Sequence, residues 1–409
     1  MTTIDATPLD PTHNAAPKRP DGDASADGSS RYGRARLWLG IGTVGLHVVI
    51  AALLLGSGSL DRLEQRWSGG WAGDIALLAL VAGLYVVTQL PSDVLGGYLL
   101  PRRHGRRVPS ASVFAARLAR GVAVHAATWF VAACGLLIAG RLFGVPGVIG
   151  VSVALSALLL MARPPLARAM ADLRVTCVDD AARRGDTAAS DDIPRAWVET
   201  DDEAFTGGVL GALRPRRVWA PSLWRRALSS EQLALAWERR GLIARSAEWR
   251  RGRWVALAFT WLGVSLLAAW LGGERLDNAV GLVMLALGFT LWSFVGLLLL
   301  PTLSRAGVAS VDRRWRARVG DDSAIDGVIR ALDRLQDDEP VRASGVEAIF
   351  HPVPSVANRG ASALVSRWPG CLDAARTSVF LGLAGLGFLG RAVHCNCGRP
   401  ALWVWLPSD

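Results

Sequence analysis

The chain has 409 residues, of which 51% are hydrophobic, and its formal net charge is +10. Its positive mean hydropathy is unusual for a soluble protein and indicates a membrane protein. A basic chain can bind nucleic acid, but here the arginines flank long apolar stretches, where membrane topology and anionic headgroups explain them, so we expect no nucleic-acid partner. The five cysteines are scattered, which excludes a disulfide framework.

Residues 1–36 form an N-terminal tail rich in Pro, Asp, Ala, Ser and Gly. Such a composition cannot bury enough apolar surface to fold, so we expect this tail to be disordered. It lacks the pattern of a cleavable signal peptide, and we expect the first apolar stretch to act as an uncleaved anchor.

About 20 apolar residues are needed to cross a bilayer, and six stretches approach or reach that length, followed by a shorter seventh. The seven are Leu37–Leu55, Ala72–Leu90, Gly121–Leu142, Val145–Ala162, Trp254–Leu271, Ala279–Leu300 and Ser378–Val393. Lipid tolerates only helices or closed barrels, so each stretch predicts a helix. The predicted fold class is mainly α, a polytopic α-helical membrane protein with six to seven spans. An odd number of spans would place the two termini on opposite sides.

These stretches divide the chain into six parts. They are the tail 1–36, a four-helix membrane region 37–163, a polar segment 164–252, two membrane helices 253–300, a second polar segment 301–375, and a last hydrophobic helix with the C-terminal tail 376–409. Arginines concentrate in alternate loops, and cytoplasmic loops retain Lys and Arg. We therefore expect a cytoplasmic N-terminus, two cytoplasmic polar segments, and localisation in a bacterial inner membrane.

The two polar segments carry their own predicted elements. In the first, Ala196–Thr200 and Arg217–Ala220 are candidate strands, and a helix is expected from Ser230 to about Trp249. Ser229 followed by Gln232 matches a capping box at its start. In the second, helices are expected over Ser304–Arg318 and Ala324–Leu335. Asp74 and Asp93 lie near the ends of predicted spans, where we expect water to reach them.

Four short blocks stand out around these segments. They are Gln89 to Tyr98 with His104-Gly105, Glu203-Ala204-Phe205-Thr206-Gly207-Gly208 with the strand at 217–221, Ala236-Trp237-Glu238-Arg239-Arg240-Gly241, and Ser304 to Arg313. His351-Pro352 and Arg359 follow downstream.

In this order the blocks resemble the membrane zinc metallopeptidases that include HtpX and the CAAX prenyl proteases, over roughly residues 75–365. The resemblance implies a cytoplasmic peptidase-like α(+β) domain. It also implies a zinc ion held by H-E-x-x-H on one helix and a Glu on another. Here the three ligand positions hold Trp237, Gly241 and Val308. Glu238 matches the general base of the family and Asp312 its support residue, while the remaining motif residues are Phe205, Gly207, His351 and Arg359.

The substituted positions cannot ligate zinc. An indole offers a metal no lone pair, and Gly and Val carry no ligand. No two histidines stand at i and i+4. Without an activated water, a general base supplies only about 10²–10⁴-fold. We therefore expect a degenerate, inactive homologue (a pseudopeptidase) with no zinc or other cofactor. It would lie in the lipid bilayer and act by binding a membrane protein or peptide.

Other interpretations stay open. Glu238 could pair with an arginine, Trp237 could fill the space of metal and water, and the likeness of this helix could be accidental. An active metalloendopeptidase could use Glu238, Asp312 and His351 as non-standard ligands. An unrelated transporter or scaffold would place polar residues along several spans. His394, Cys395 and Cys397 offer three ligands, too few for a closed zinc site.

Overall fold

The computed structural model describes residues 23–67, 70–177, 193–200, 202–211, 216–336, 338–360 and 368–405. Within these ranges five helices are long and apolar enough to cross a membrane. They are α1 (Asp23–Gly56), α3 (Gly70–Val94), α5 (Ala111–Ala171), α9 (Ala247–Leu271) and α10 (Ala279–Val319). The chain is therefore mainly α-helical and polytopic, as its hydropathy predicts.

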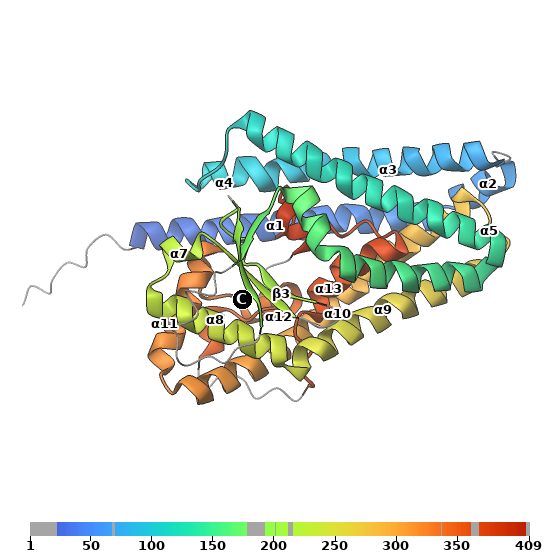
Figure 1. The fold of residues 1–409 in the computed structure, drawn as a ribbon. Helices are drawn as coiled ribbons and strands as arrows, with labels where there is room; N and C mark the ends of the chain where they lie inside the picture. Colours follow the sequence, from blue (N-terminus) through green and yellow to red (C-terminus); the bar gives the residue numbers. More distant parts are fainter. Residues whose placement is uncertain are drawn as a thin grey trace, which may run out of the picture.

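The helix α5 contains two passes rather than one. It reverses at Gly144, whose φ of 58° and ψ of −142° are non-helical, and the two legs return side by side (Figure 1). Arg120 on the first leg donates from Nε to the carbonyl oxygen of Ala169 on the second, 2.7 Å away. The two predicted spans Gly121–Leu142 and Val145–Ala162 are these legs, so the described residues make six passes.

The predicted seventh span is wrong. Instead of one helix over Ser378–Val393, the chain forms α13 (Ala374–Leu381), a 3-10 turn (Gly382–Gly385) and irregular turns. Leu386 has a left-handed φ of 61°, which no helix accommodates. The segment is buried among the other helices, where Trp129 donates from Nε1 to its Leu386 carbonyl. It is apolar because protein, not lipid, surrounds it.

The start of the chain also differs from the prediction. The first helix begins at Asp23, well before Leu37, so the last part of the expected tail 1–36 is helical. Residues 1–22 lie outside the described residues. The short helix α2 (Ser59–Arg66) connects α1 to α3 at one end of the bundle, on the right in Figure 1.

The helix α3 continues through Pro91 before the chain turns at His104 and Gly105. A π-helical turn (Leu95–Leu99) and α4 (Leu100–Arg103) follow it directly. The π-turn carries Gly97, where a Cβ would lie 2.3 Å from the carbonyl oxygen of Gly398. Only glycine permits this contact between the π-turn that follows α3 and residues 386–405, which we call the C-terminal segment.

Parts of the first polar segment form a four-stranded sheet. Its strands are β1 (Arg174–Cys177), β2 (Arg195–Glu199), β3 (Gly208–Leu210) and β4 (Arg217–Pro221), in the order β1-β2-β4-β3. The central pair β2–β4 is parallel and both outer pairs are antiparallel. The strands β2 and β4 correspond to the two predicted extended stretches.

The remaining helices lie beside the sheet at one end of the bundle (Figure 1). They are α7 (Trp224–Ala227), α8 (Ser230–Arg245), α11 (Asp322–Leu335), α12 (Ser344–Phe350) and a 3-10 turn (Val356–Arg359), and α14 (Pro400–Val404) closes the chain. The helix α8 ends earlier than the predicted Trp249, because Ser246 is extended and caps α9 by accepting from the Trp249 amide.

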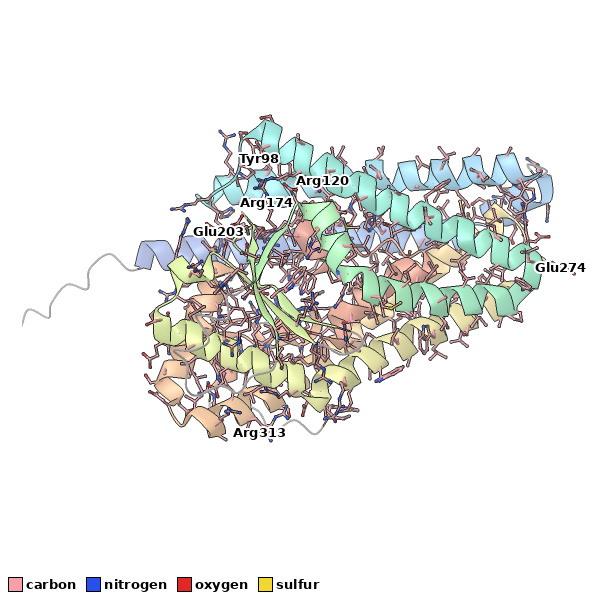
Figure 2. All side chains as sticks on the ribbon, viewed as in Figure 1. Tyr98, Arg120, Arg174, Glu203, Glu274 and Arg313 are labelled. Carbon is pink, nitrogen blue, oxygen red and sulfur yellow. The ribbon has the colours of Figure 1, made fainter. Side chains whose placement is uncertain are left out.

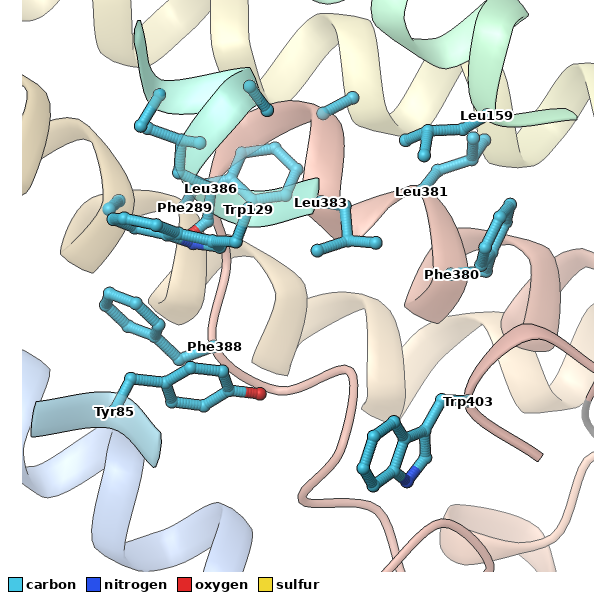
Figure 3. Close-up of a cluster of buried hydrophobic side chains, with 14 of the residues drawn as sticks. Tyr85, Trp129, Leu159, Phe289, Phe380, Leu381, Leu383, Leu386, Phe388 and Trp403 are labelled. Carbon is cyan, nitrogen blue, oxygen red and sulfur yellow. The ribbon is translucent and has the colours of Figure 1, made fainter. Parts of the chain in front are cut away.

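Hydrophobic packing forms two main clusters. One lies inside the bundle, where Tyr85, Trp129 and Phe388 pack around the Leu386 turn (Figure 3). The other joins β4, α8, α10 and α11. Charged groups mark both ends of the molecule: Arg174, Glu203 and Arg313 lie at the sheet end, and Glu274 lies at the opposite end (Figure 2).

Candidate functional site where two helices meet

The helix α8 begins at the predicted capping box. Ser229 Oγ accepts from the Gln232 amide at 3.2 Å, and the Ser229 amide donates to Gln232 Oε1 at 3.1 Å. This reciprocal pair satisfies two backbone donors that the first turn leaves without helical partners. It fixes where the helix starts.

A buried carboxylate joins α8, α10 and the turn Val356–Arg359. Asp312 Oδ1 accepts from Arg239 Nε at 2.9 Å, and its Oδ2 accepts from Arg359 Nε at 2.8 Å. All three side chains are buried. Burial alone would raise the pKa of Asp312, but the guanidinium groups of Arg239 and Arg359 outweigh it and lower that pKa. Asp312 is therefore an ionised anchor between two cations.

Glu238 makes a separate and more exposed ion pair. Its Oε1 lies 2.9 Å from Nε of Arg318, near the end of α10, and the two side chains are 31% and 57% exposed. The structure thus gives this carboxylate an arginine partner. Glu238 of α8 pairs with Arg318, whereas Asp312 of α10 pairs with Arg239 and Arg359, so the two residues that match the family's acids lie in different ion pairs.

The three ligand positions of the motif are occupied by buried groups. Trp237 is 8% exposed and packs edge-to-face on Trp197 of β2, with ring centroids 5.1 Å apart. Val308 is 1% exposed and belongs to the same hydrophobic cluster as Trp237. Gly241 is buried on α8. The three positions therefore contribute hydrocarbon and an aromatic ring to the packing between β2, α8 and α10.

Zinc does not fit this donor set. A catalytic zinc takes three protein ligands with available lone pairs, and an indole, a glycine and an isopropyl group supply none. Within the described residues no group of three His, Cys, Asp or Glu side chains is arranged to hold a metal. Among these residues, neither Glu238, Asp312 and His351 nor His394, Cys395 and Cys397 come together as a metal centre.

Arg240 connects the helix to the Phe205–Gly207 block. Its Nη1 donates to the Trp219 carbonyl of β4 at 3.0 Å, and its Nη2 donates to the Thr206 carbonyl at 2.5 Å. Gly207 has a φ of 72°, and a Cβ there would lie 2.3 Å from the same Trp219 carbonyl. Phe205 is fully buried. Sequence reasoning missed Arg240, because the motif H-E-x-x-H assigns no role to its position.

His351 contacts the C-terminal segment. It is buried after α12, and its ring centroid is 5.2 Å from that of His394 in the C-terminal segment. Of the downstream motif residues, Arg359 reaches the carboxylate of Asp312. The structure therefore brings Arg359 to the contact between α8 and α10 and places His351 against the C-terminal segment.

The expectation that water reaches Asp74 and Asp93 is wrong. Their exposed fractions are 1% and 0%. Asp74 forms an ion pair with Arg141 and accepts from the Ala279 amide at 3.1 Å. Asp93 forms an ion pair with Arg391 and accepts from the Gly398 amide. Both acids lie at helix ends, as the sequence suggests, but other parts of the chain cover those ends.

These features define a polytopic α-helical membrane protein in which a small sheet and a helix pair close one end of the bundle. No family model matches the chain, and no curated protein matches it. Among solved structures, the chain is similar to the crystal structure of S. mikatae Ste24p. The TM-score is 0.64 at 12% sequence identity, over 82% of this chain and 88% of that one. At this identity the likeness shows a shared fold.

Proposed function

We propose that this chain is a proteolytically inactive homologue of the CAAX-type membrane metallopeptidases that binds a membrane protein or peptide. The fold shared with Ste24p supports the CAAX-type ancestry, and so does the order of the four sequence blocks, which also resemble HtpX. We further propose a bacterial inner membrane location with the N-terminus and the sheet in the cytoplasm, on the basis of the arginine-rich loops.

The donor set between α8 and α10 carries this proposal. Where the family motif requires two imidazoles and a carboxylate, the chain has Trp237, Gly241 and Val308. Asp312 of α10 still contacts α8, but its partners are the two arginines Arg239 and Arg359. Such a centre has no means of lowering the pKa of a water molecule, on which metal-assisted hydrolysis depends.

A direct test measures zinc and peptide cleavage with the purified full-length chain. We expect far less than one tightly bound zinc per chain by elemental analysis. We also expect no cleavage of a quenched membrane-anchored peptide above a protein-free control. The Glu238→Gln variant should behave identically, because Glu238 has no metal-bound water to deprotonate. One tightly bound zinc per chain would contradict the proposal, and cleavage that disappears in Glu238→Gln would show an active peptidase.

A second measurement tests the peptidase frame itself. The triple variant Trp237→His, Gly241→His and Val308→Glu restores the family's ligand types on α8 and α10. We expect it to gain one zinc per chain while the unmodified chain gains none. A folded triple variant that binds no more zinc than the unmodified chain would contradict the proposed ancestry.

The transporter alternative predicts polar side chains along a path through the spans. In the described residues, the buried acids Asp74 and Asp93 of α3 form ion pairs with Arg141 and Arg391. A hydrophobic cluster that includes Trp129 and Leu136 lies inside the same bundle. This arrangement favours a packed structural bundle over an ion path.

A further inference from the structure

A cavity of about 320 Å³ lies between α1, α10, α11, α13, the segment 342–359 and the C-terminal segment. Its lining is of two kinds. Leu37, Ile41, Val44, Phe294, Leu297 and Val379 form an apolar part. Arg36, Arg342, Arg359, Arg376 and Arg399 contribute a cationic part. The volume is within the range of about 300–1,000 Å³ that small-molecule sites occupy.

The two parts lie at different depths along the helices. Arg36 stands at the start of the apolar stretch of α1, and Pro301 follows the apolar stretch of α10. Ile41, Val44 and Phe294 lie within those stretches. Leu298 also lines the cavity and is 40% exposed. The apolar part is therefore at acyl-chain depth, and the cationic part is where headgroups lie.

The charges of the lining are strongly unequal. Five arginines line the cavity, and Asp333 is the one carboxylate among its described lining residues. The acids Asp312, Asp373 and Asp202, which pair with Arg359, Arg376 and Arg399, do not belong to the lining. Arg342 pairs with Asp333 of the lining and with Glu339. Arg36 is held by the carbonyl oxygens of His394 and Cys395, at 3.1 and 3.0 Å from Nη2. Carbonyl oxygens orient a guanidinium without removing its charge.

We propose that this cavity binds an anionic phospholipid, with its phosphate beside the arginines and the upper part of one acyl chain against the apolar wall. Guanidinium groups form charge-assisted, often bidentate hydrogen bonds with phosphate. A free phosphate would use the cationic part alone and leave the apolar wall without a partner. The lipid site does not depend on whether the chain cleaves peptides.

Two glycines of α1 provide a matched pair of variants. A Cβ built at Gly45 or at Gly42 meets no atom within 4 Å, so both positions have space for a side chain. Gly45 lines the cavity, whereas Gly42 is exposed and does not. Gly45→Phe should therefore fill the acyl-chain part of the site. Gly42→Phe adds the same side chain to the same helix without entering the cavity.

The test titrates the detergent-solubilised full-length chain with dioleoylphosphatidylglycerol, dioleoylphosphatidylcholine or inorganic phosphate, and counts bound molecules by native mass spectrometry. We expect one phosphatidylglycerol bound at least about tenfold more tightly than phosphatidylcholine, a difference of about 1.4 kcal/mol. Gly45→Phe should lose about tenfold or more in this affinity, and Gly42→Phe should keep it. Arg376→Gln should reduce the ratio between the affinities for phosphatidylglycerol and phosphatidylcholine.

Three outcomes would overturn the lipid site. Equal affinities for phosphatidylglycerol and phosphatidylcholine would show that the arginines do not select an anionic headgroup. Equal losses in Gly45→Phe and Gly42→Phe would place the lipid elsewhere on the bundle. Displacement of phosphatidylglycerol by an equal concentration of inorganic phosphate would indicate a site for a soluble anion. None of these results depends on the zinc and cleavage measurements, so the two proposals can fail separately.

Discussion

Arg239 and Asp312 form an ion pair, 2.9 Å from Nε to Oδ1, in which both side chains are almost completely buried. The preceding residue, Glu238, pairs with Arg318 farther along α10, where both groups contact solvent. Adjacent residues of α8 thus make two ion pairs of opposite polarity with the same helix. Because solvent screens only the outer pair, their contributions to stability should differ widely.

The first prediction compares the two carboxylates. Asp312→Asn removes the negative charge that faces two buried guanidinium groups, and breaking a buried ion pair costs about 3–5 kcal/mol. Glu238→Gln breaks a partly exposed pair, which is worth about 0–1 kcal/mol. The free energy of unfolding in detergent should fall strongly in Asp312→Asn and only slightly in Glu238→Gln. Losses of similar size would contradict the burial of the Asp312 cluster.

The second prediction concerns pH. The pKa of Asp312 is lowered in the folded state, because its two arginine partners outweigh burial. Its contribution to stability is therefore complete above the unfolded-state pKa of about 3.9 and is lost as the pH falls through the lower folded value. The unfolding temperature of the unmodified chain should fall more steeply below about pH 4 than that of Asp312→Asn. Parallel pH profiles would show that Asp312 is not the group responsible.

Local sequence patterns predicted the parts of the fold that depend on local physics. Apolar stretches about 20 residues long marked the six passes, and Ser229 with Gln232 marked the start of α8. The error over Ser378–Val393 has a physical cause, because hydropathy does not distinguish a segment buried in protein from one surrounded by lipid. Its glycines allow the turns that hydropathy ignores.

The contacts at the site could not be predicted in the same way. The partners Arg239 and Asp312 lie 73 positions apart, and Asp93 lies 298 positions from Arg391. No periodic pattern links residues so distant. The nearness of α8 to α10 was expected only through the family resemblance, which assigned no role to Arg239 or Arg240. Those two arginines make the contacts that hold α8 against α10 and the sheet.

The third prediction addresses the buried pair between α3 and the C-terminal segment. Asp93 and Arg391 are both fully buried, so removing either partner leaves a charge facing a nonpolar interior. Asp93→Leu and Arg391→Met should each destabilise the chain by about 3–5 kcal/mol. Replacing both by apolar residues of similar size should recover much of that loss, because apolar substitution of a whole buried pair is often neutral. Additive losses in the double variant would contradict a direct ion pair.

The last prediction concerns the side of the membrane on which each end of the bundle lies. Arg313 is exposed at the sheet end and Glu274 is exposed at the opposite end (Figure 2). The apolar stretch of α10 separates the two positions and is long enough to cross the bilayer. Arg313→Cys and Glu274→Cys should therefore react with a membrane-impermeant maleimide from opposite faces of sealed vesicles, with the unmodified chain as the background for its native cysteines.

We expect the sheet end to be cytoplasmic, because arginines concentrate there and cytoplasmic loops retain Lys and Arg. The thiol of Arg313→Cys should react in inside-out vesicles, and that of Glu274→Cys in right-side-out vesicles. Since the described residues make six passes, epitope tags at the two termini should be digested by protease from the same face as Arg313→Cys is labelled. Digestion of the two tags from opposite faces would require an additional pass, and residues 378–393 would then have to cross the bilayer after all.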